Sequence, residues 1–196
     1  MAITIEDIKA LREKTGVSVM QCKKALEEAD GDMEKAIIIL TKKSGDIVSK
    51  KSDRELGAGM VQAYIHAGGS VGAMVELNSE TDFVAKHEDF GKLAYDIAMH
   101  IAAQNPTYLS REEVKDEDLT KAKEVFVEEV KDKSAEMQEK ILEGKIDSYL
   151  KERILLEQSF IKDPSKAIKD LISEATQKFG EKIEIARYVS FTVLGE

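Results

Sequence analysis

The stretch Thr81-Asp82-Phe83-Val84 places a large apolar ring beside a carboxylate, where a strand is expected to give way to a helix. The residues that follow are polar, and a helical apolar pattern resumes only near Phe90. An aromatic side chain at such a junction can bury a large area in a partner with few rotamers to freeze. Isolated loop aromatics more commonly pack locally, so residue types alone favour Phe83 folding back under its own helix.

Other residues that could do chemistry are too scattered to form a site. The three histidines, His66, His87 and His100, are far apart in the chain, and a single cysteine, Cys22, cannot build a structural zinc site. No glycine-rich phosphate loop is followed by Lys-Ser or Lys-Thr. No nucleophile stands in a pattern with a base, so we expect neither an enzyme nor a cofactor or metal.

Composition narrows the classes of protein further. The 196 residues are 42% hydrophobic, enough for one domain or for a small and a medium one. The net charge is −9. Residues 1–53 hold ten basic and ten acidic residues, so the whole excess of acidic residues lies in residues 54–196. Direct nucleic-acid binding is therefore not expected. The longest apolar run, residues 36–40, is too short for a membrane span, and the lone cysteine and absent signal segment favour the cytoplasm.

Residues 1–53 read as a three-helix binding module. Thr4 with Asp7 fits an N-terminal capping box, Thr15-Gly16 ends that helix, and Ser18 with Gln21 caps the next. Apolar residues recur at helical spacing in the second and third helices. They are Val19, Cys22 and Leu26 in the second, and Met33, Ala36, Ile37 and Leu40 in the third. Residues 41–58, with the basic pairs at 42–43 and 50–51, lack sustained periodicity and predict a linker or a loosely held helix.

The period then changes to that of strands. Val61, Ala63 and Ile65 form one apolar face, Gly68-Gly69-Ser70 turns the chain, and residues 71–77 resume the alternation as a hairpin partner. Residues 183–193 predict a third strand. Residues 54–196 therefore predict an α+β domain, a small antiparallel three-stranded sheet with helices on one face.

Helices are expected between and beside these strands. Apolar residues recur at helical spacing from Phe90 to Ile101, which predicts a helix. A charged helical region is expected from Ser110 through Lys133. Residues 137–160 predict more helix, broken near Gly144. A last helix is expected to open at Pro164 and close at Gly180.

Several motifs together resemble the bacterial elongation factor Ts family, over nearly the whole chain. They are Leu11-Arg12, Thr15-Gly16, Met20, Cys22-Lys23-Lys24-Ala25-Leu26, Gly31-Asp32, Thr81-Asp82-Phe83-Val84-Ala85-Lys86, Ala98-Met99-His100-Ile101-Ala102-Ala103, Leu155-Leu156-Glu157-Gln158 and Phe160-Ile161-Lys162-Asp163-Pro164-Ser165. The family's usual Thr-Gly-Ala-Gly-Met-Met reads Thr15-Gly16-Val17-Ser18-Val19-Met20 here, with one methionine fewer. The chain is also too short for the duplicated core and coiled-coil insertion of longer members.

The resemblance implies a guanine nucleotide exchange factor that binds elongation factor Tu. It implies a ubiquitin-associated-like bundle in residues 1–53 and a core in residues 54–196 that joins two copies into a homodimer. It assigns partner contacts to Arg12, Met20, Lys23, His66, Thr81, Asp82, Phe83 and Val84. With this resemblance the preference for Phe83 reverses, from local packing to a wedge in the partner.

A protein-interaction scaffold built on the helical bundle is the alternative from another functional class. A pure scaffold has no use for the segment 81–84, which therefore discriminates between the two functions.

Overall fold

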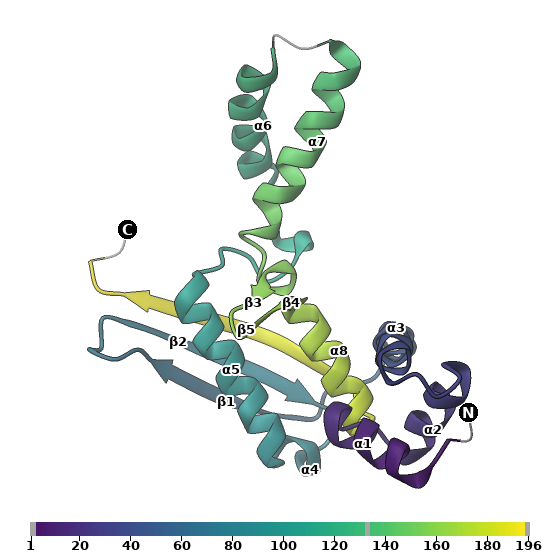
Figure 1. Ribbon diagram of the computed structural model, residues 1–196. Helices are drawn as coiled ribbons and strands as arrows, with labels where there is room; N and C mark the ends of the chain where they lie inside the picture. The colour runs from purple at the N-terminus through teal and green to yellow at the C-terminus, as the bar shows by residue number, and fades with distance from the viewer. Residues whose placement is uncertain (1–2, 132–133, 195–196) are drawn as a thin grey trace.

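The computed structural model describes residues 3–131 and 134–194 and begins with three short helices (Figure 1). These are α1 (Ile5–Thr15), α2 (Val19–Glu28) and α3 (Met33–Lys51). Their shared core contains Leu11, Val17, Cys22, Ala25, Leu26, Ala36 and Leu40. Helical spacing alone predicted Cys22, Leu26, Ala36 and Leu40 of this core.

The caps of these helices follow the sequence closely. The Thr4 hydroxyl accepts from the Asp7 amide at 3.2 Å, and the Asp7 carboxylate accepts from the Thr4 amide at 3.0 Å, which confirms the capping box. Gly16, at φ +69°, ends α1 in the left-handed region. The interior position expected for Val19 is wrong. Val19 is 51% exposed, because Val17, just before the helix, fills the core instead.

Helix α3 continues to Lys51 through most of the segment expected to be a linker. Of the linker and the helix that the sequence left open for residues 41–58, the helix is confirmed as far as Lys51. Ser44 is 3% exposed in the middle of this extension, and α3 lies against helix α8 (Ile168–Phe179). The extension is therefore a continuous helix, packed on α8, that connects the first module to the rest of the chain.

A three-stranded antiparallel sheet forms the centre of the molecule. Its order is β1 (Ala58–Ile65), β2 (Val71–Ser79), β5 (Ile183–Thr192). Helices α5 (Glu88–Gln104) and α8 cover one face, as Figure 1 shows, which confirms the expected α+β architecture. The core between the layers contains Ala73, Val75, Leu77, Phe90, Ala94, Ile97, Ile101, Ile168, Ile172, Ile183 and Ile185.

The face predicted for β1 is wrong. Met60 pairs with the buried Leu77, so even-numbered residues of β1 point towards the helices. Val61 and Ile65 point the other way and are 58% and 66% exposed. Both faces of this strand carry some apolar residues, so the alternation did not distinguish the inner face from the outer one.

A β-bulge in β5 changes which residues face the helices. Ile183 and Ile185 are buried, but the register shifts opposite Glu76 and Leu77. One residue more on the bulged strand reverses the alternation, so Val189 and Phe191 lie on the outer face.

Helices α6 (Asp116–Val130) and α7 (Ala135–Lys151) form an arm that projects away from the sheet (Figure 1). The sequence predicted helix in both parts of this arm, but the chain was expected to be too short for a coiled-coil insertion, and these two helices nevertheless pack against each other. Gly144 lies inside α7 without breaking it. The arm is entered through a short 3-10 helix, Arg111–Glu113, where the charged helical region was expected to start. Lys133, its expected end, lies outside the described residues.

The segment after the arm differs from the prediction. Residues 152–160 are not α-helical but contain a 3-10 helix, Leu155–Glu157, and strand β3 (Ser159–Phe160). Pro164 lies in strand β4 (Asp163–Ala167) rather than in the first turn of a helix. Helix α8 begins only at Ile168, and Gly180 (φ +72°) closes it as expected.

None of the helices in the described ranges is both long enough and apolar enough to cross a membrane.

Candidate protein-binding site

Phe83 lies on α4 (Asp82–Ala85), a single helical turn after β2. Its side chain is 79% exposed, so local packing under the following helix is excluded. The next two residues, Val84 and Ala85, are 4% and 6% exposed and belong to the main core. The turn is thus anchored on one side and presents a bare aromatic ring on the other.

Val84 differs from the other residues predicted to contact a partner. Its side chain is enclosed in the core of this chain and is not available at the surface. The apolar residue after Phe83 therefore holds the turn in place from beneath.

The start of α4 is held by a residue distant in the chain. The Thr81 amide and hydroxyl both donate to the Glu181 carboxylate, at 3.0 and 2.7 Å. The Ser79 hydroxyl donates to the Thr81 carbonyl at 2.9 Å. Two long-range hydrogen bonds on one residue fix the backbone from which Phe83 projects.

Asp82 supplies an exposed negative charge next to the ring. Lys86 donates to its carboxylate at 2.6 Å, and this hydrogen bond is the main reason that the pKa of Asp82 lies below its ordinary value. Both side chains are largely exposed, so Asp82 can exchange Lys86 for another donor at little cost.

The contacts predicted for the first module also lie on its surface. Met20 is 70% exposed beside the exposed Val19, and Lys23 follows one helical turn later with Glu27 at 3.8 Å. Arg12 is exposed on α1. The departure at residues 17–19 is thus absorbed locally, because Val17 enters the core while Val19 adds apolar surface next to Met20.

His66 lies at the opposite end of the hairpin, after β1. The Tyr64 hydroxyl is 3.0 Å from His66 Nδ1, and the Tyr64 ring meets the edge of Tyr95 at 5.6 Å. Beside them is a cavity of about 300 Å³ lined by Tyr64, His66, Val71, Met99, Ala102, Ala103 and Ile161. Met99, Ala103 and Ile161 belong to motifs that the sequence singled out without giving them a role.

The predicted site residues thus fall into two groups. Phe83 and the first module are connected through the end of α8. His66 is separated from Phe83 by the length of β2. The eight steps of about 3.3 Å along the nine residues of β2 place them roughly 26 Å apart. One chain does not bring all of these residues together.

The uncovered side of the sheet forms a further apolar surface, here called the outer sheet face. Its large residues are 42% to 66% exposed: Val61, Ile65, Met74, Val189 and Phe191. The pair Glu76–Arg187, at 2.7 Å, lies among them and lowers the pKa of Glu76 through its hydrogen bond. Sequence reasoning missed this surface because it placed the apolar face of β1 inside.

In the part of the chain that the structure describes, acidic and histidine side chains do not gather in a way that suits a metal. Within the described ranges, no three His, Cys, Asp or Glu residues stand close enough to hold an ion. The exposed surfaces described above are suited to binding another protein.

The comparisons with known proteins agree on one family. A sequence model described as Elongation factor TS matches residues 6–196. Elongation factor Ts of Thermodesulfovibrio yellowstonii is 50% identical over 194 residues, covering 98% of this chain and 97% of that protein. Those of Herpetosiphon aurantiacus and Moorella thermoacetica are each 47% identical, over 195 and 193 residues; the matches cover 98% and 97% of this chain and 98% and 95% of those proteins.

Proposed function

This chain belongs to the elongation factor Ts family, and from that premise we propose that it accelerates release of GDP from elongation factor Tu during translation. It acts as a guanine nucleotide exchange factor rather than as an enzyme that makes or breaks covalent bonds. The protein works in the cytoplasm, with no membrane or direct nucleic-acid contact.

Exchange of this kind needs differential binding and no catalytic group. A factor that binds the nucleotide-free G protein more tightly than the loaded one weakens nucleotide binding by the same factor. One buried aromatic ring contributes about 1.5–3 kcal/mol, and a hydrogen bond to a charged group adds about 1.5–3 kcal/mol. Phe83 together with Asp82 is therefore sufficient for a large acceleration.

The observation that carries the proposal is the 79% exposure of Phe83 on a turn anchored by the buried Val84 and Ala85. An aromatic ring that an anchored turn holds at the surface can bury a large apolar area in a partner with few rotamers to freeze. Thr81 and Asp82 contact the partner around the ring. Val84 contributes by supporting the turn.

Residues 1–53, which we take to be a ubiquitin-associated-like module, provide a second contact area. Arg12, Met20 and Lys23 form this area, with an apolar centre and basic flanks. The module supplies affinity, whereas the core in residues 54–196 carries the wedge.

A homodimer completes the site. The outer sheet face is large and apolar, and pairing it with its own copy about a two-fold axis would cover it. Since His66 and Phe83 lie at opposite ends of one hairpin, a partner can use Phe83 of one subunit and His66 of the other.

Stopped-flow release of labelled GDP from elongation factor Tu tests the function. We expect the full chain to raise the release rate in a saturable manner, with excess unlabelled GDP present. An unchanged release rate at micromolar concentrations of both proteins would contradict the proposal.

A further inference from the structure

Residues 177–182, which are the last three residues of α8 and the connection to β5, contact both the first module and the residue before the Phe83 turn. We call this segment the α8–β5 turn. These six residues reach the first module on one side and the Phe83 turn on the other. Gln177 and Gln21 are 156 residues apart in the sequence, and Glu181 and Thr81 are 100 residues apart. Figure 1 shows the end of α8 between the N-terminal helices and α4.

On the side of Phe83, two acidic residues make the connection. Glu181 holds the amide and hydroxyl of Thr81, immediately before α4. Glu80, on the other side of the same junction, accepts from the Lys182 amide at 2.5 Å and from Arg54 at 3.1 Å. Two consecutive residues before α4, Glu80 and Thr81, are thus attached to the turn.

On the side of the module, three hydrogen bonds reach the turn. Gln177 donates to the side chain of Gln21 at 3.1 Å. Lys51, the last residue of α3, donates to the Gly180 carbonyl at 2.6 Å, and Lys182 donates to the Ser52 carbonyl at 2.9 Å. The end of α3 and the end of α8 therefore bind each other reciprocally.

Lys178 joins three elements at once. Its aliphatic stem lies so close to Gly16, in the turn between α1 and α2, that a Cβ there would be 3.0 Å from Lys178 Cδ. Its ammonium donates to Asp89 at 2.8 Å, on the first turn of α5. The module turn is thus connected to the helix that directly follows the Phe83 segment.

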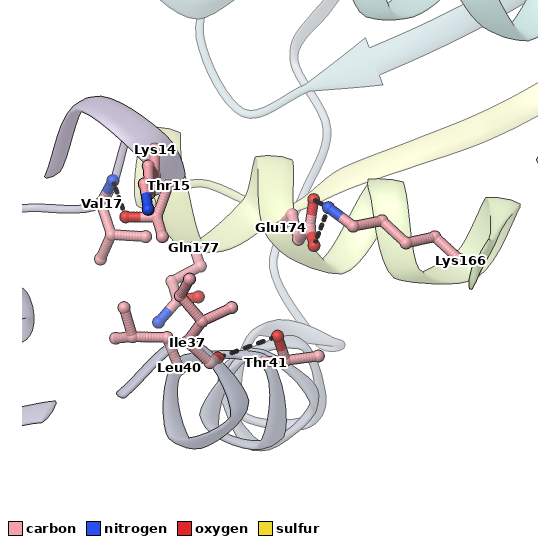
Figure 2. Close-up of a pocket in the computed structure, with 9 residues that line it drawn as sticks. All are labelled: Lys14, Thr15, Val17, Ile37, Leu40, Thr41, Lys166, Glu174 and Gln177. Atoms are coloured by element: carbon pink, nitrogen blue, oxygen red, sulfur yellow. Dashed lines mark hydrogen bonds and ion pairs between the residues drawn. The ribbon is translucent and has the colours of Figure 1, made fainter. Parts of the chain in front are cut away.

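Apolar packing alone does not fix the module on α8. A cavity of about 240 Å³ lies at this junction. Figure 2 shows Gln177 of α8 facing Ile37 and Leu40 of α3. The Glu174–Lys166 ion pair, at 2.7 Å, lines the other side of the cavity. Because apolar contact is incomplete at this gap, the hydrogen bonds of the α8–β5 turn add to the contact between α3 and α8 in fixing the orientation of the module.

We infer that the α8–β5 turn is a positioning device that holds the first module and the Phe83 turn at one fixed geometry, so that both engage a single partner molecule together. This rests on the proposed roles of Phe83 and the module. Glu181 acts on exchange through Thr81 and Phe83, and Lys51 acts through the orientation of α3.

The effect of Glu181 is measured in two ways on the full chain. Glu181→Ala is expected to lower the maximal GDP release rate at saturating factor at least fivefold, with the half-saturating concentration within twofold of wild type. Glu181→Gln keeps an acceptor for Thr81 and is expected to recover most of the rate. Glu139→Ala, an equal charge change on the exposed face of α7, serves as control.

A readout independent of exchange uses the absence of tryptophan from the chain. In a Phe83→Trp protein, adding Glu181→Ala is expected to lower the anisotropy of the single indole in the free factor. An unchanged anisotropy together with an unchanged maximal rate would overturn the inference. Should Phe83→Ala leave exchange at the wild-type rate, the wedge itself fails, while the anisotropy still reports on Glu181.

The module side has its own variant. Lys51→Ala combined with Gln177→Ala is expected to raise the half-saturating concentration at least threefold while the maximal rate stays within twofold. Lys140→Ala, at an exposed position of α7, is the matched control. An unchanged half-saturating concentration, with the double variant folded, would show that the turn does not orient the module.

Discussion

His100 is fully buried on α5, and both of its ring nitrogens are occupied. Nε2 lies 3.0 Å from the Gln158 side-chain oxygen, while Nδ1 accepts from the Ile161 amide at 3.4 Å. Gln158 in turn donates to the Glu152 carbonyl at 2.6 Å. This pattern fits the neutral ring with its proton on Nε2, and it connects α5 to the segment below the arm.

Protonation of His100 is expected to destabilise the fold at mildly acidic pH. Burial is the main reason that its pKa lies below 6.5, although the hydrogen bond to Gln158 opposes the shift. In the interval below pH 6.5 the unfolded chain therefore binds a proton that the folded chain excludes. The stabilisation is complete above that value and is lost as the pH falls through the folded pKa.

Urea unfolding at pH 7.5, 6.5 and 5.5 measures this effect. We expect the free energy of unfolding to fall with pH in the wild type and to fall less steeply in His100→Gln, which is less stable at neutral pH. His66 and His87 are exposed and serve as internal comparison through their own Gln variants. If the free energy of unfolding changed equally with pH in the wild type and in His100→Gln, protonation of His100 would not be the cause of the loss of stability.

At the residue scale, the sequence allowed contact residues to be proposed but did not show how each side chain is placed. The position of Phe83 between two periodic patterns singles it out, but residue types alone favour local packing, so its exposure could not be deduced from them. Val84 was grouped with it by motif although it is buried. The difference depends on the direction of one helical turn, which is set by the long-range contact between Thr81 and Glu181.

At the scale of elements, the arm is fixed to the core by a charged clamp. Arg111 donates to Asp147 of α7 at 2.5 Å and to both oxygens of Glu157, with the Nη2 bond at 2.7 Å. Hydrogen bonds from Lys151 and Arg111 lower the pKa of Asp147 to about 2. Because these groups are partly exposed, the clamp orients the arm more than it stabilises the molecule.

Gly144→Ala is expected to stabilise the arm by about 0.5–1 kcal/mol, because glycine inside a helix is disfavoured relative to alanine. A Cβ at this position would meet nothing within 4 Å. Amides of α7 should exchange with solvent roughly two to five times more slowly.

Gly68→Ala provides a matched control. A Cβ there also meets nothing within 4 Å, but φ is +92°, so the same substitution is strained and should destabilise the hairpin. Equal effects of the two substitutions would show that helix propensity does not govern the arm.

The first module is expected to fold on its own as residues 1–53 and to bind elongation factor Tu weakly without stimulating exchange. Its helices share a core separate from that of the sheet, and α3 ends at Lys51. Bundles of this size are marginal, so we expect a helical circular-dichroism spectrum with a broad thermal transition. Exchange activity of the fragment near that of the full chain would contradict this division of roles.

Element types were largely predictable, whereas faces and breaks were not. Proline is compatible with an edge strand as well as with a first helical turn, and tertiary pairing of β3 with β4 decided for Pro164. The bulge in β5 depends on pairing with β2 and leaves no local signature. The outer sheet face was therefore not predicted, although all of its residues stood in the predicted strands.

At the scale of the whole molecule, pairing of two copies through the outer sheet face is expected to depend on Met74. Met74→Glu places a charge between Ala63 and Val189 on neighbouring strands, where burial in an interface would be costly. Light scattering at micromolar concentration under reducing conditions should give about twice 21.8 kDa for the wild type and the monomer mass for the variant.

Val125→Glu, at an exposed valine of the arm, is the control and should stay dimeric. A wild-type mass of 21.8 kDa with full exchange activity would refute both the dimer and the two-subunit site.

The central claim is that the exposed ring of Phe83 drives nucleotide release, and Phe83→Ala tests it most directly. The variant should keep the fold, because the ring is 79% exposed, and Val84 should still anchor the turn. Loss of about 1.5–3 kcal/mol of apolar contact corresponds to a release rate roughly 10- to 150-fold lower at saturating factor. Stopped-flow release of labelled GDP gives this rate. A folded Phe83→Ala protein that releases GDP as fast as the wild type would contradict the account.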